Sequence, residues 1–223
     1  DASASACGRC AVCDPDGALP LTPPSELVNA AVAFMRASHQ LIEPRKQYPV
    51  RVDDKRSIPK TLQLEEGRAL CLWGDPGFGA LVRQGKYQDG RFSEELVSAL
   101  AEMLREWDPA PRPKWIAFIP SLRHPDLVPA LAARLGEQLG IPVLPLIEKV
   151  RDHAEQKDMQ NSAHQFSNVR QAFRLTGSPP DIPGLLLDDV VDSRWTLTVA
   201  GVLLRGGGSG PVFPITLAMS TGN

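Results

Sequence analysis

The sequence predicts an α/β fold built on a parallel β-sheet, and three observations lead to this prediction. Residues 114–147 alternate between strand, helix and strand patterns. The run Gly184–Leu187 is continuously apolar, which is typical of a strand buried on both faces of a parallel sheet. A helical pattern follows soon after and ends at the three glycines Gly206–Gly208. Strands that alternate with helices predict a parallel sheet covered by helices.

The first of these observations defines a β-α-β unit. Lys114–Ile119 has the pattern of a strand, and Asp126 caps a helix that ends at Gly140. Apolar side chains recur along that helix at Leu127, Val128, Leu131, Leu135 and Leu139. We expect Ile141–Ile147 to form the second strand, parallel to the first and joined to it by a right-handed crossover.

Residues 61–107 supply the elements upstream of this unit. We expect a strand at Arg68–Trp73, a turn at Gly74–Gly77, a short helix at Gly79–Gln84 and a longer helix capped by Ser93. The glycine-rich turn lacks the spacing of a phosphate-binding P-loop, so we interpret it as a turn alone. Cys71 lies within the apolar strand, and we interpret it as a core residue.

The strongest candidate for a ligand site lies where the apolar run Gly184–Leu187 ends. Asp188 and Asp189 follow at the carboxyl end of that strand, and a helix is expected from Thr196 to about Leu204. Ligands of open α/β sheets bind outside the carboxyl ends of the strands, and a helix N-terminus attracts anions. Two carboxylates beside such an anion site predict a sugar phosphate as the ligand.

This stretch resembles the phosphoribosyl-pyrophosphate motif of type I phosphoribosyltransferases. The resemblance implies that Asp188 and Asp189 bind the ribose hydroxyls, and that phosphoribosyl pyrophosphate is bound with Mg²⁺. It also implies a loop around the 5′-phosphate, formed by Asp192, Ser193, Arg194, Trp195 and Thr196. The family usually has glycine at the position of Arg194 and a small residue at that of Trp195. Arg194 either supplies its own phosphate contact or fills the pocket, and the sequence leaves both alternatives open.

Residues 93–220 resemble more specifically the ComF-type branch of this family. The matched motifs follow in order: Ile119-Pro120-Ser121, Lys149-Val150-Arg151-Asp152 and Asn168-Val169-Arg170-Gln171-Ala172-Phe173. The resemblance implies a pyrophosphate-binding loop after the first strand. Ser121 and Arg123 are the candidate anion contacts there, because both lie in a loop at a strand's carboxyl end. Residues 151–180 are polar and form either a lid over the site or a surface helix-turn.

Residues 1–19 contain the metal-ligand candidates Cys7, Cys10 and Cys13. Thiolates at two overlapping C-x-x-C spacings can converge on one tetrahedral zinc ion, which needs a fourth ligand that we expect upstream of Asp1. The alternative is a cut chain end with free thiols. The tract resembles the end of the zinc-binding subdomain of RecQ-like DNA helicases, with Ala11 where that family usually has Asp.

Residues 20–62 are expected to form a small linking module. Ser25 caps a helix, and an extended basic stretch with Arg45, Lys46 and Arg51 follows. This pattern fits the last part of a winged-helix module that contacts DNA, which RecQ-like helicases commonly place after the zinc subdomain. A solvated linker without a DNA contact is the alternative. Residues 63–223 would then be the phosphoribosyltransferase-like domain.

The order of these segments resembles that of a bacterial subgroup of RecQ-like helicases, the RqlH type. The resemblance implies an ATP-dependent 3′-to-5′ helicase whose motor domains precede this chain, which itself lacks the Gly-x-x-x-x-Gly-Lys-Ser/Thr motif. We therefore expect an accessory region that binds DNA or a phosphorylated small molecule without transferase turnover. The alternative is an active, Mg²⁺-dependent phosphoribosyltransferase. A formal net charge of -2 and no long apolar run favour a cytoplasmic protein without a membrane partner.

Overall fold

A computed structural model describes residues 7–8, 12–13, 22–49, 57–150, 166–167 and 169–220. Its centre is a five-stranded sheet in the order β1-β2-β7-β6-β3. Four of the strands run parallel and β1 is antiparallel to β2. The strands are β1 (Gln40–Ile42), β2 (Gly67–Leu72), β3 (Ile116–Phe118), β6 (Gly184–Val191) and β7 (Val212–Met219). The predicted α/β fold with a mainly parallel sheet is confirmed.

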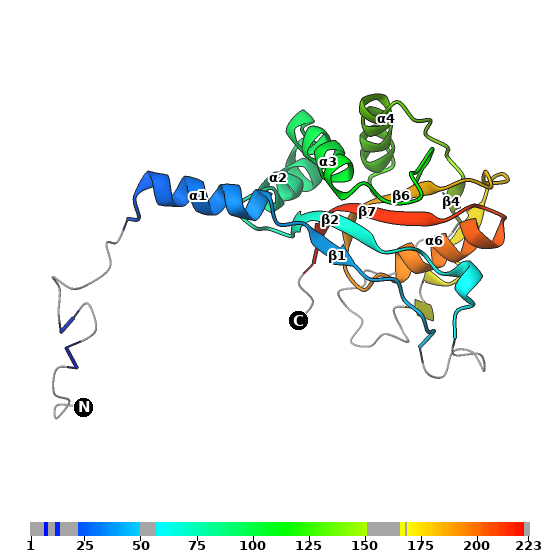
Figure 1. The fold of residues 1–223 in the computed structure, drawn as a ribbon, viewed down its shortest axis with the longest axis horizontal. Coiled ribbons are helices and arrows are strands. Elements are labelled where there is room, and N and C mark those ends of the chain that lie inside the picture. The colour runs from blue at the N-terminus through cyan, green and yellow to red at the C-terminus, as the bar shows by residue number, and fades with distance from the viewer. Residues whose placement is uncertain are drawn as a thin grey trace.

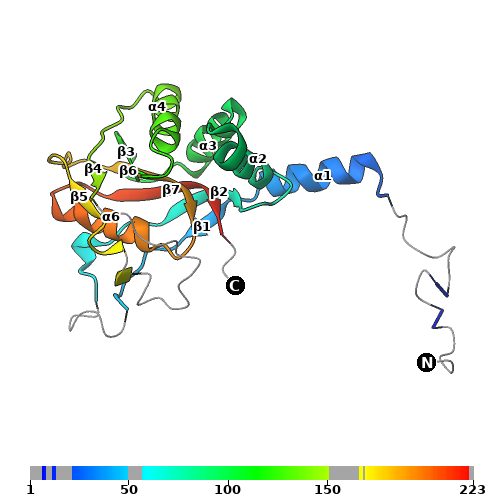
Figure 2. The same ribbon diagram turned by 180° about the vertical axis from the view of Figure 1, so that it is seen from behind.

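Helices cover both faces of this sheet (Figures 1 and 2). α2, α3 and α4 lie over one face and α6 lies over the other, whereas α1 extends away from the sheet. The helices are α1 (Ser25–Arg36), α2 (Gly79–Gln84), α3 (Glu94–Trp107), α4 (Leu127–Leu139) and α6 (Trp195–Gly206), with short turns η1 (Lys60–Leu62) and η2 (Gly85–Asp89). α3 begins as predicted, because the Ser93 side chain accepts a hydrogen bond from the Leu96 N–H at 3.4 Å.

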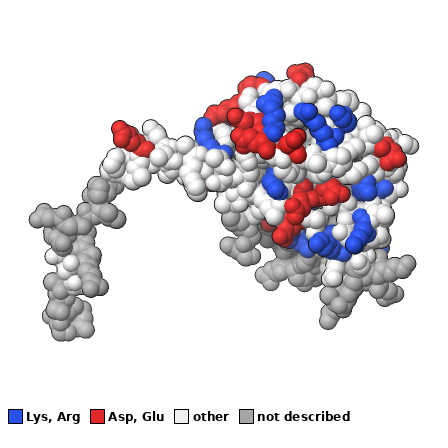
Figure 3. All heavy atoms as spheres, in the orientation of Figure 1, with Lys and Arg blue, Asp and Glu red and all other residues white. Residues whose placement is uncertain are grey.

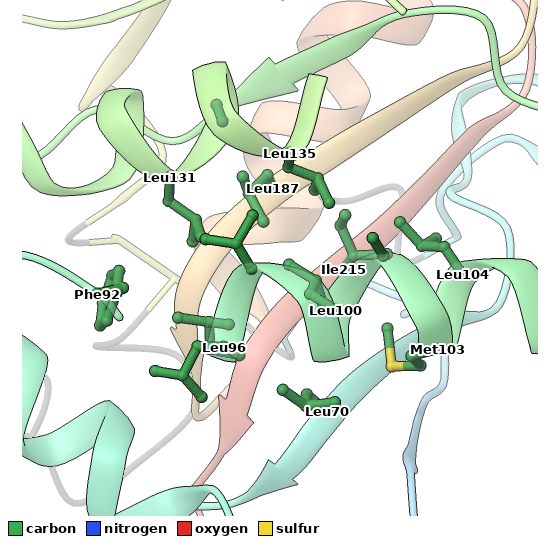
Figure 4. Close-up of a cluster of buried hydrophobic side chains, with 14 of the residues drawn as sticks. Leu70, Phe92, Leu96, Leu100, Met103, Leu104, Leu131, Leu135, Leu187 and Ile215 are labelled. Atoms are coloured by element: carbon green, nitrogen blue, oxygen red, sulfur yellow. The ribbon is translucent and has the colours of Figure 1, made fainter. Parts of the chain in front are cut away.

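The two faces of the sheet carry separate hydrophobic clusters. Successive strand residues point to opposite faces, so Leu187 of β6 packs under α3 and α4 while Leu186 packs under α6. Figure 4 shows the first cluster, in which α3, α4 and the strands meet through Leu70, Phe92, Leu96, Leu100, Met103, Leu104, Leu131, Leu135, Leu187 and Ile215. The strand β6 is therefore buried on both sides, as its apolar sequence predicts.

The prediction of one strand over Ile141–Ile147 is wrong in its extent. Val143 forms a single parallel bridge with Ile116, and the chain then leaves the main sheet. Ile147 begins β4 (Ile147–Lys149), which pairs antiparallel with β5 (Phe173–Leu175) in a separate two-stranded sheet. Two prolines within residues 141–147 explain the interruption, since proline has no N–H to donate to a strand ladder.

The segment predicted as a linking module reaches into the main sheet. β1 supplies its edge strand, with Gln40, Leu41 and Ile42 paired to Ala69, Arg68 and Gly67 of β2. The module boundary between residues 62 and 63 and the winged-helix interpretation stay predictions. No helix among the described residues has both the length and the apolar character needed to span a bilayer.

Candidate functional site

The acidic pair lies near the carboxyl end of β6 and is almost completely buried. Asp188 and Asp189 are each 8% exposed. One oxygen of Asp189 lies 2.7 Å from the Lys86 ammonium, and the other accepts the Val190 N–H at 2.8 Å. Asp188 accepts the N–H of Asp189 at 2.8 Å. The structure therefore places the two acids within the last half of β6, two residues before it ends at Val191, and adds a lysine that the sequence analysis missed.

The electrostatics of this cluster follow from burial. Desolvation, reinforced by the charge of Asp189, raises the pKa of Asp188 well above its ordinary value despite the opposing effect of Lys86. Burial by itself lowers the pKa of Lys86, but the attraction and hydrogen bond of Asp189 outweigh it and leave that pKa raised. Lys86 therefore stays an ammonium, and burial favours the protonated form of Asp188.

Lys86 is held against the acids by the segment that follows β2. The Asp75 carboxylate accepts the N–H groups of Leu72, Gly77 and Gly79 at 2.9, 2.8 and 3.0 Å, which closes a tight turn before α2. η2 continues from α2 as a π-helical turn and carries Lys86. A five-residue π turn has no sequence periodicity that could predict it, which explains why this lysine was missed.

Arg194 begins the helix α6 in a conformation that favours glycine. Its φ is 66°, in the left-handed region, and it occupies the N-cap position. One guanidinium nitrogen donates to the Glu43 carbonyl at 3.2 Å and lies 3.8 Å from the Glu43 carboxylate. The backbone thus keeps the shape that the resemblance associates with glycine, while the side chain contacts the segment after β1.

Trp195 is a core residue beneath the loop. Its side chain is 1% exposed and meets the Phe166 ring edge-on, with centroids 4.9 Å apart. The Arg45 guanidinium lies over the Trp195 ring, 3.9 Å from its centroid. The same guanidinium donates two hydrogen bonds to the Ser193 carbonyl, at 2.9 and 2.6 Å. The bulky residue therefore packs inward and supports the loop from below.

The three residues predicted to contact DNA have different surroundings. Arg45 faces the Ser193 loop, and its pKa is lowered to about 10 by burial and by the nearby Arg194. Lys46 is exposed, and Arg51 lies outside the described residues. Acidic and basic side chains are interspersed over the described part of the face in Figure 3. Arg45 is thus engaged by Trp195 and the Ser193 carbonyl, whereas Lys46 is exposed.

The remaining candidate ligand residues lie at the same edge of the sheet. Ser121 and Arg123 follow β3, which is the parallel neighbour of β6 through the Ile119 N–H bond to Leu187 at 2.8 Å. The Ser121 hydroxyl accepts the His124 N–H at 3.3 Å, and Arg123 is exposed. The other two candidates are Asp192, which is exposed in the loop after β6, and Thr196, which lies in the first turn of α6.

The cysteines fall into two groups. Sγ of Cys7 lies 3.7 Å from Sγ of Cys13, and Cys13 Sγ also accepts the Cys7 N–H at 3.3 Å. Cys10 lies outside the described residues, within which no group of three His, Cys, Asp or Glu side chains is placed to hold a metal. Cys71 is buried as predicted, donates to the Leu217 carbonyl, and has its thiol pKa raised to about 12, mainly by burial.

The acidic pair as it stands does not fit a directly coordinated Mg²⁺. Magnesium requires hard oxygen ligands in near-octahedral geometry. One oxygen of Asp189 is engaged by the Lys86 ammonium, the other by the Val190 N–H, and Asp188 already accepts a backbone N–H. A metal ion at Asp189 would have to displace the lysine.

Comparison with known proteins gives matches to solved structures alone, since no family model and no curated protein matches. An adenine phosphoribosyltransferase from Leishmania tarentolae is 15% identical, with a TM-score of 0.37 over 58% of this chain and 72% of that one. A purine phosphoribosyltransferase from Pyrococcus horikoshii OT3 is 17% identical, with a TM-score of 0.35 over 59% and 90%. A further adenine phosphoribosyltransferase is 13% identical, with a TM-score of 0.39 over 86% and 98%. At these values the likeness says nothing about ligand or reaction.

Proposed function

We propose that the carboxyl edge of the sheet binds a phosphorylated sugar without transferase turnover. The observation that carries this proposal is the buried cluster of Asp188, Asp189 and Lys86 beside the loop that leads into α6. Carboxylate oxygens accept hydrogen bonds from sugar hydroxyls. The N-terminus of a helix favours a phosphate through its dipole and its backbone N–H groups. The two features together suit one sugar phosphate.

Binding is favoured over turnover because the acidic pair already holds a cation. Transfer of a phosphoribosyl group needs strong stabilisation of the departing pyrophosphate, which Mg²⁺ supplies in metal-assisted phosphate chemistry. The Lys86 ammonium lies 2.7 Å from Asp189 and reduces the negative charge available to a metal. An active Mg²⁺-dependent phosphoribosyltransferase remains the runner-up, with the same acids as its ribose contacts.

The wider role that we propose is that of an accessory region in a RecQ-like DNA helicase. The order of the cysteine tract, linking module and α/β domain supports it, by resemblance. The geometry at Cys7 and Cys13 supports the zinc part: two thiolates on one tetrahedral zinc, at about 2.3 Å each, lie about 3.8 Å apart. The observed Sγ–Sγ distance is 3.7 Å. The partners would be DNA and the preceding motor domains.

Calorimetry tests the ligand proposal. Ribose 5-phosphate and phosphoribosyl pyrophosphate are titrated separately into the wild type and into the double variant Asp188→Asn, Asp189→Asn. We expect binding that the double variant abolishes and that Glu66→Gln, an exposed acid away from the site, leaves unchanged. Absence of binding at millimolar ligand would sink the proposal. Release of pyrophosphate with Mg²⁺ and a nucleobase would instead establish the transferase.

A separate experiment tests the nucleic-acid role. Because phosphate contacts release counterions, specific protein–DNA affinity should fall steeply with salt. The double variant Lys46→Ala, Arg51→Ala removes two of the predicted contacts while leaving Arg45 in its place at the Ser193 loop. We expect a weaker shift of DNA in a gel and a smaller salt dependence. A shift unchanged by this variant would remove the basic stretch from the DNA interface.

A further inference from the structure

Lys86 has the position and surroundings of a structural cation. Its ammonium lies 2.7 Å from an Asp189 oxygen, and its side chain is 21% exposed. Surface lysines are strongly hydrated and rarely held in one geometry, whereas this one is largely removed from water. Its charge is also attracted by Asp188, the second acid of the pair. The ammonium therefore forms its ion pair with Asp189 and is attracted more weakly by Asp188.

The backbone around Lys86 is fixed by close packing. A side chain at Gly85 would place its Cβ 2.8 Å from the Arg91 carbonyl oxygen and 2.9 Å from the Phe92 ring, so glycine permits η2 to sit against this loop. On the other side of Lys86, Tyr87 meets the Trp73 ring edge-on with centroids 6.0 Å apart. Lys86 is thus flanked by two neighbours that constrain where its side chain can reach.

We propose that Lys86 replaces a divalent metal at the acidic pair, so that the site takes a sugar monophosphate without Mg²⁺. The ligand class rests on the proposed function, whereas the replacement of the metal rests on the Lys86–Asp189 contact alone. A divalent metal bound directly to Asp189 would bring a second cation close to the Lys86 ammonium, and like charges at short range in a buried site repel strongly. A single phosphate at the α6 end needs no such metal. Lys86 is therefore a specificity-determining residue.

Metal binding in the absence of any sugar tests whether Lys86 replaces a divalent metal at the acidic pair. Mn²⁺, which gives a paramagnetic resonance signal when free, is titrated into the wild type, Lys86→Met and Lys86→Arg. We expect Lys86→Met to bind one more Mn²⁺ than the wild type, and the added Asp189→Asn change to remove that site. Lys86→Arg retains the positive charge and should gain none. Lys114→Met, which changes an exposed lysine two residues before β3, is the matched control.

Two results would overturn this part. One is an equal number of Mn²⁺ sites in the wild type and Lys86→Met, with Lys86→Gln giving the same result if the methionine variant does not fold. The other is a gained site that survives Asp189→Asn, since the metal would then lie elsewhere. Neither result depends on whether a sugar phosphate binds.

The ligand part is tested with ribose 5-phosphate in EDTA and in Mg²⁺. We expect wild-type affinity to agree within twofold in the two buffers, and Lys86→Met to bind at least tenfold more weakly in EDTA than in Mg²⁺. Wild-type binding that requires Mg²⁺ would overturn the inference. If ribose 5-phosphate fails to bind in either buffer while Lys86→Met still gains a Mn²⁺ site, the proposed function fails and the replacement of the metal stands.

Discussion

The acidic pair and the loop that follows it are neighbours in sequence but are held in opposite ways. Asp188 and Asp189 are buried charges that an ion pair with Lys86 partly offsets. The loop at Ser193 and Arg194 is followed by the buried Trp195, whose ring contacts both Phe166 and the Arg45 guanidinium. Side-chain packing therefore stabilises the Ser193–Arg194 loop, whereas an ion pair stabilises the acidic pair.

This difference shows how the two regions can serve one ligand. Burying a charge lowers stability unless the charge is paired. Buried acids are therefore more typical of ligand sites than of parts that only stabilise the fold. A tightly packed tryptophan stabilises the fold and fixes the backbone beside which a phosphate would lie. We therefore expect changes at the loop to affect stability most, and changes at the pair to affect its dependence on pH and metal.

The largest effect should come from removing the packing beneath the loop. Trp195→Ala empties a fully buried site and should lower the free energy of unfolding by about 3–5 kcal/mol, measured by urea denaturation. Trp195→Phe keeps an aromatic ring and should cost clearly less. A loss below about 1 kcal/mol for the alanine variant would show that the loop does not depend on this packing.

Arg45 should show the next largest effect. Arg45→Ala removes the contact with the Trp195 ring and two hydrogen bonds to the Ser193 carbonyl, and should lower stability by about 1–2 kcal/mol. Lys46→Ala, which changes an exposed neighbour, should stay within about 0.5 kcal/mol of the wild type. Equal effects of the two variants would contradict the supporting role of Arg45.

The acidic pair should make the stability of the protein depend on pH. Because the pKa of Asp188 is raised in the folded state, the folded protein holds this proton more tightly than the unfolded chain. Stability from this group is therefore present below the unfolded pKa and lost as pH rises through the folded pKa. Asp188→Asn should therefore be more stable than the wild type above that range, and the difference should vanish near pH 3.

Thermal unfolding of the wild type and Asp188→Asn across pH 3 to 9 measures this difference. A constant offset at every pH would mean that packing, rather than ionisation, distinguishes the two proteins. Glu66→Gln is the control, because an exposed acid should give nearly parallel curves.

The smallest effect is expected at Arg194. Arg194→Gly relieves the left-handed backbone but loses the contact with Glu43 and adds freedom to the unfolded chain, so stability should change by less than about 0.5 kcal/mol. Arg194→Val should be destabilised by about 1–2 kcal/mol relative to glycine, since a branched side chain suits this conformation poorly. Similar unfolding midpoints for the two variants would contradict the importance of the backbone shape.

Much of the fold follows from local sequence. Apolar runs bounded by glycine and proline predicted β2 and β6, and the Ser93 cap predicted the start of α3. The failure at residues 141–147 has a local cause as well, because its prolines interrupt a strand that the apolar pattern favoured. The pairing of β4 with β5 joins distant segments, which no local pattern encodes.

The candidate site also has a part that the local sequence predicts and a part that only the tertiary structure reveals. The sequence by itself determined that Asp188 and Asp189 belong to a buried strand that precedes a helix, whereas β6 continues past them to Val191. The tertiary structure alone decided which remote side chains complete the site. Lys86 reaches Asp189 from the segment after β2, and Arg45 reaches Ser193 from the segment after β1. Such contacts depend on how the sheet and its turns bring distant residues together, so they became visible only in three dimensions.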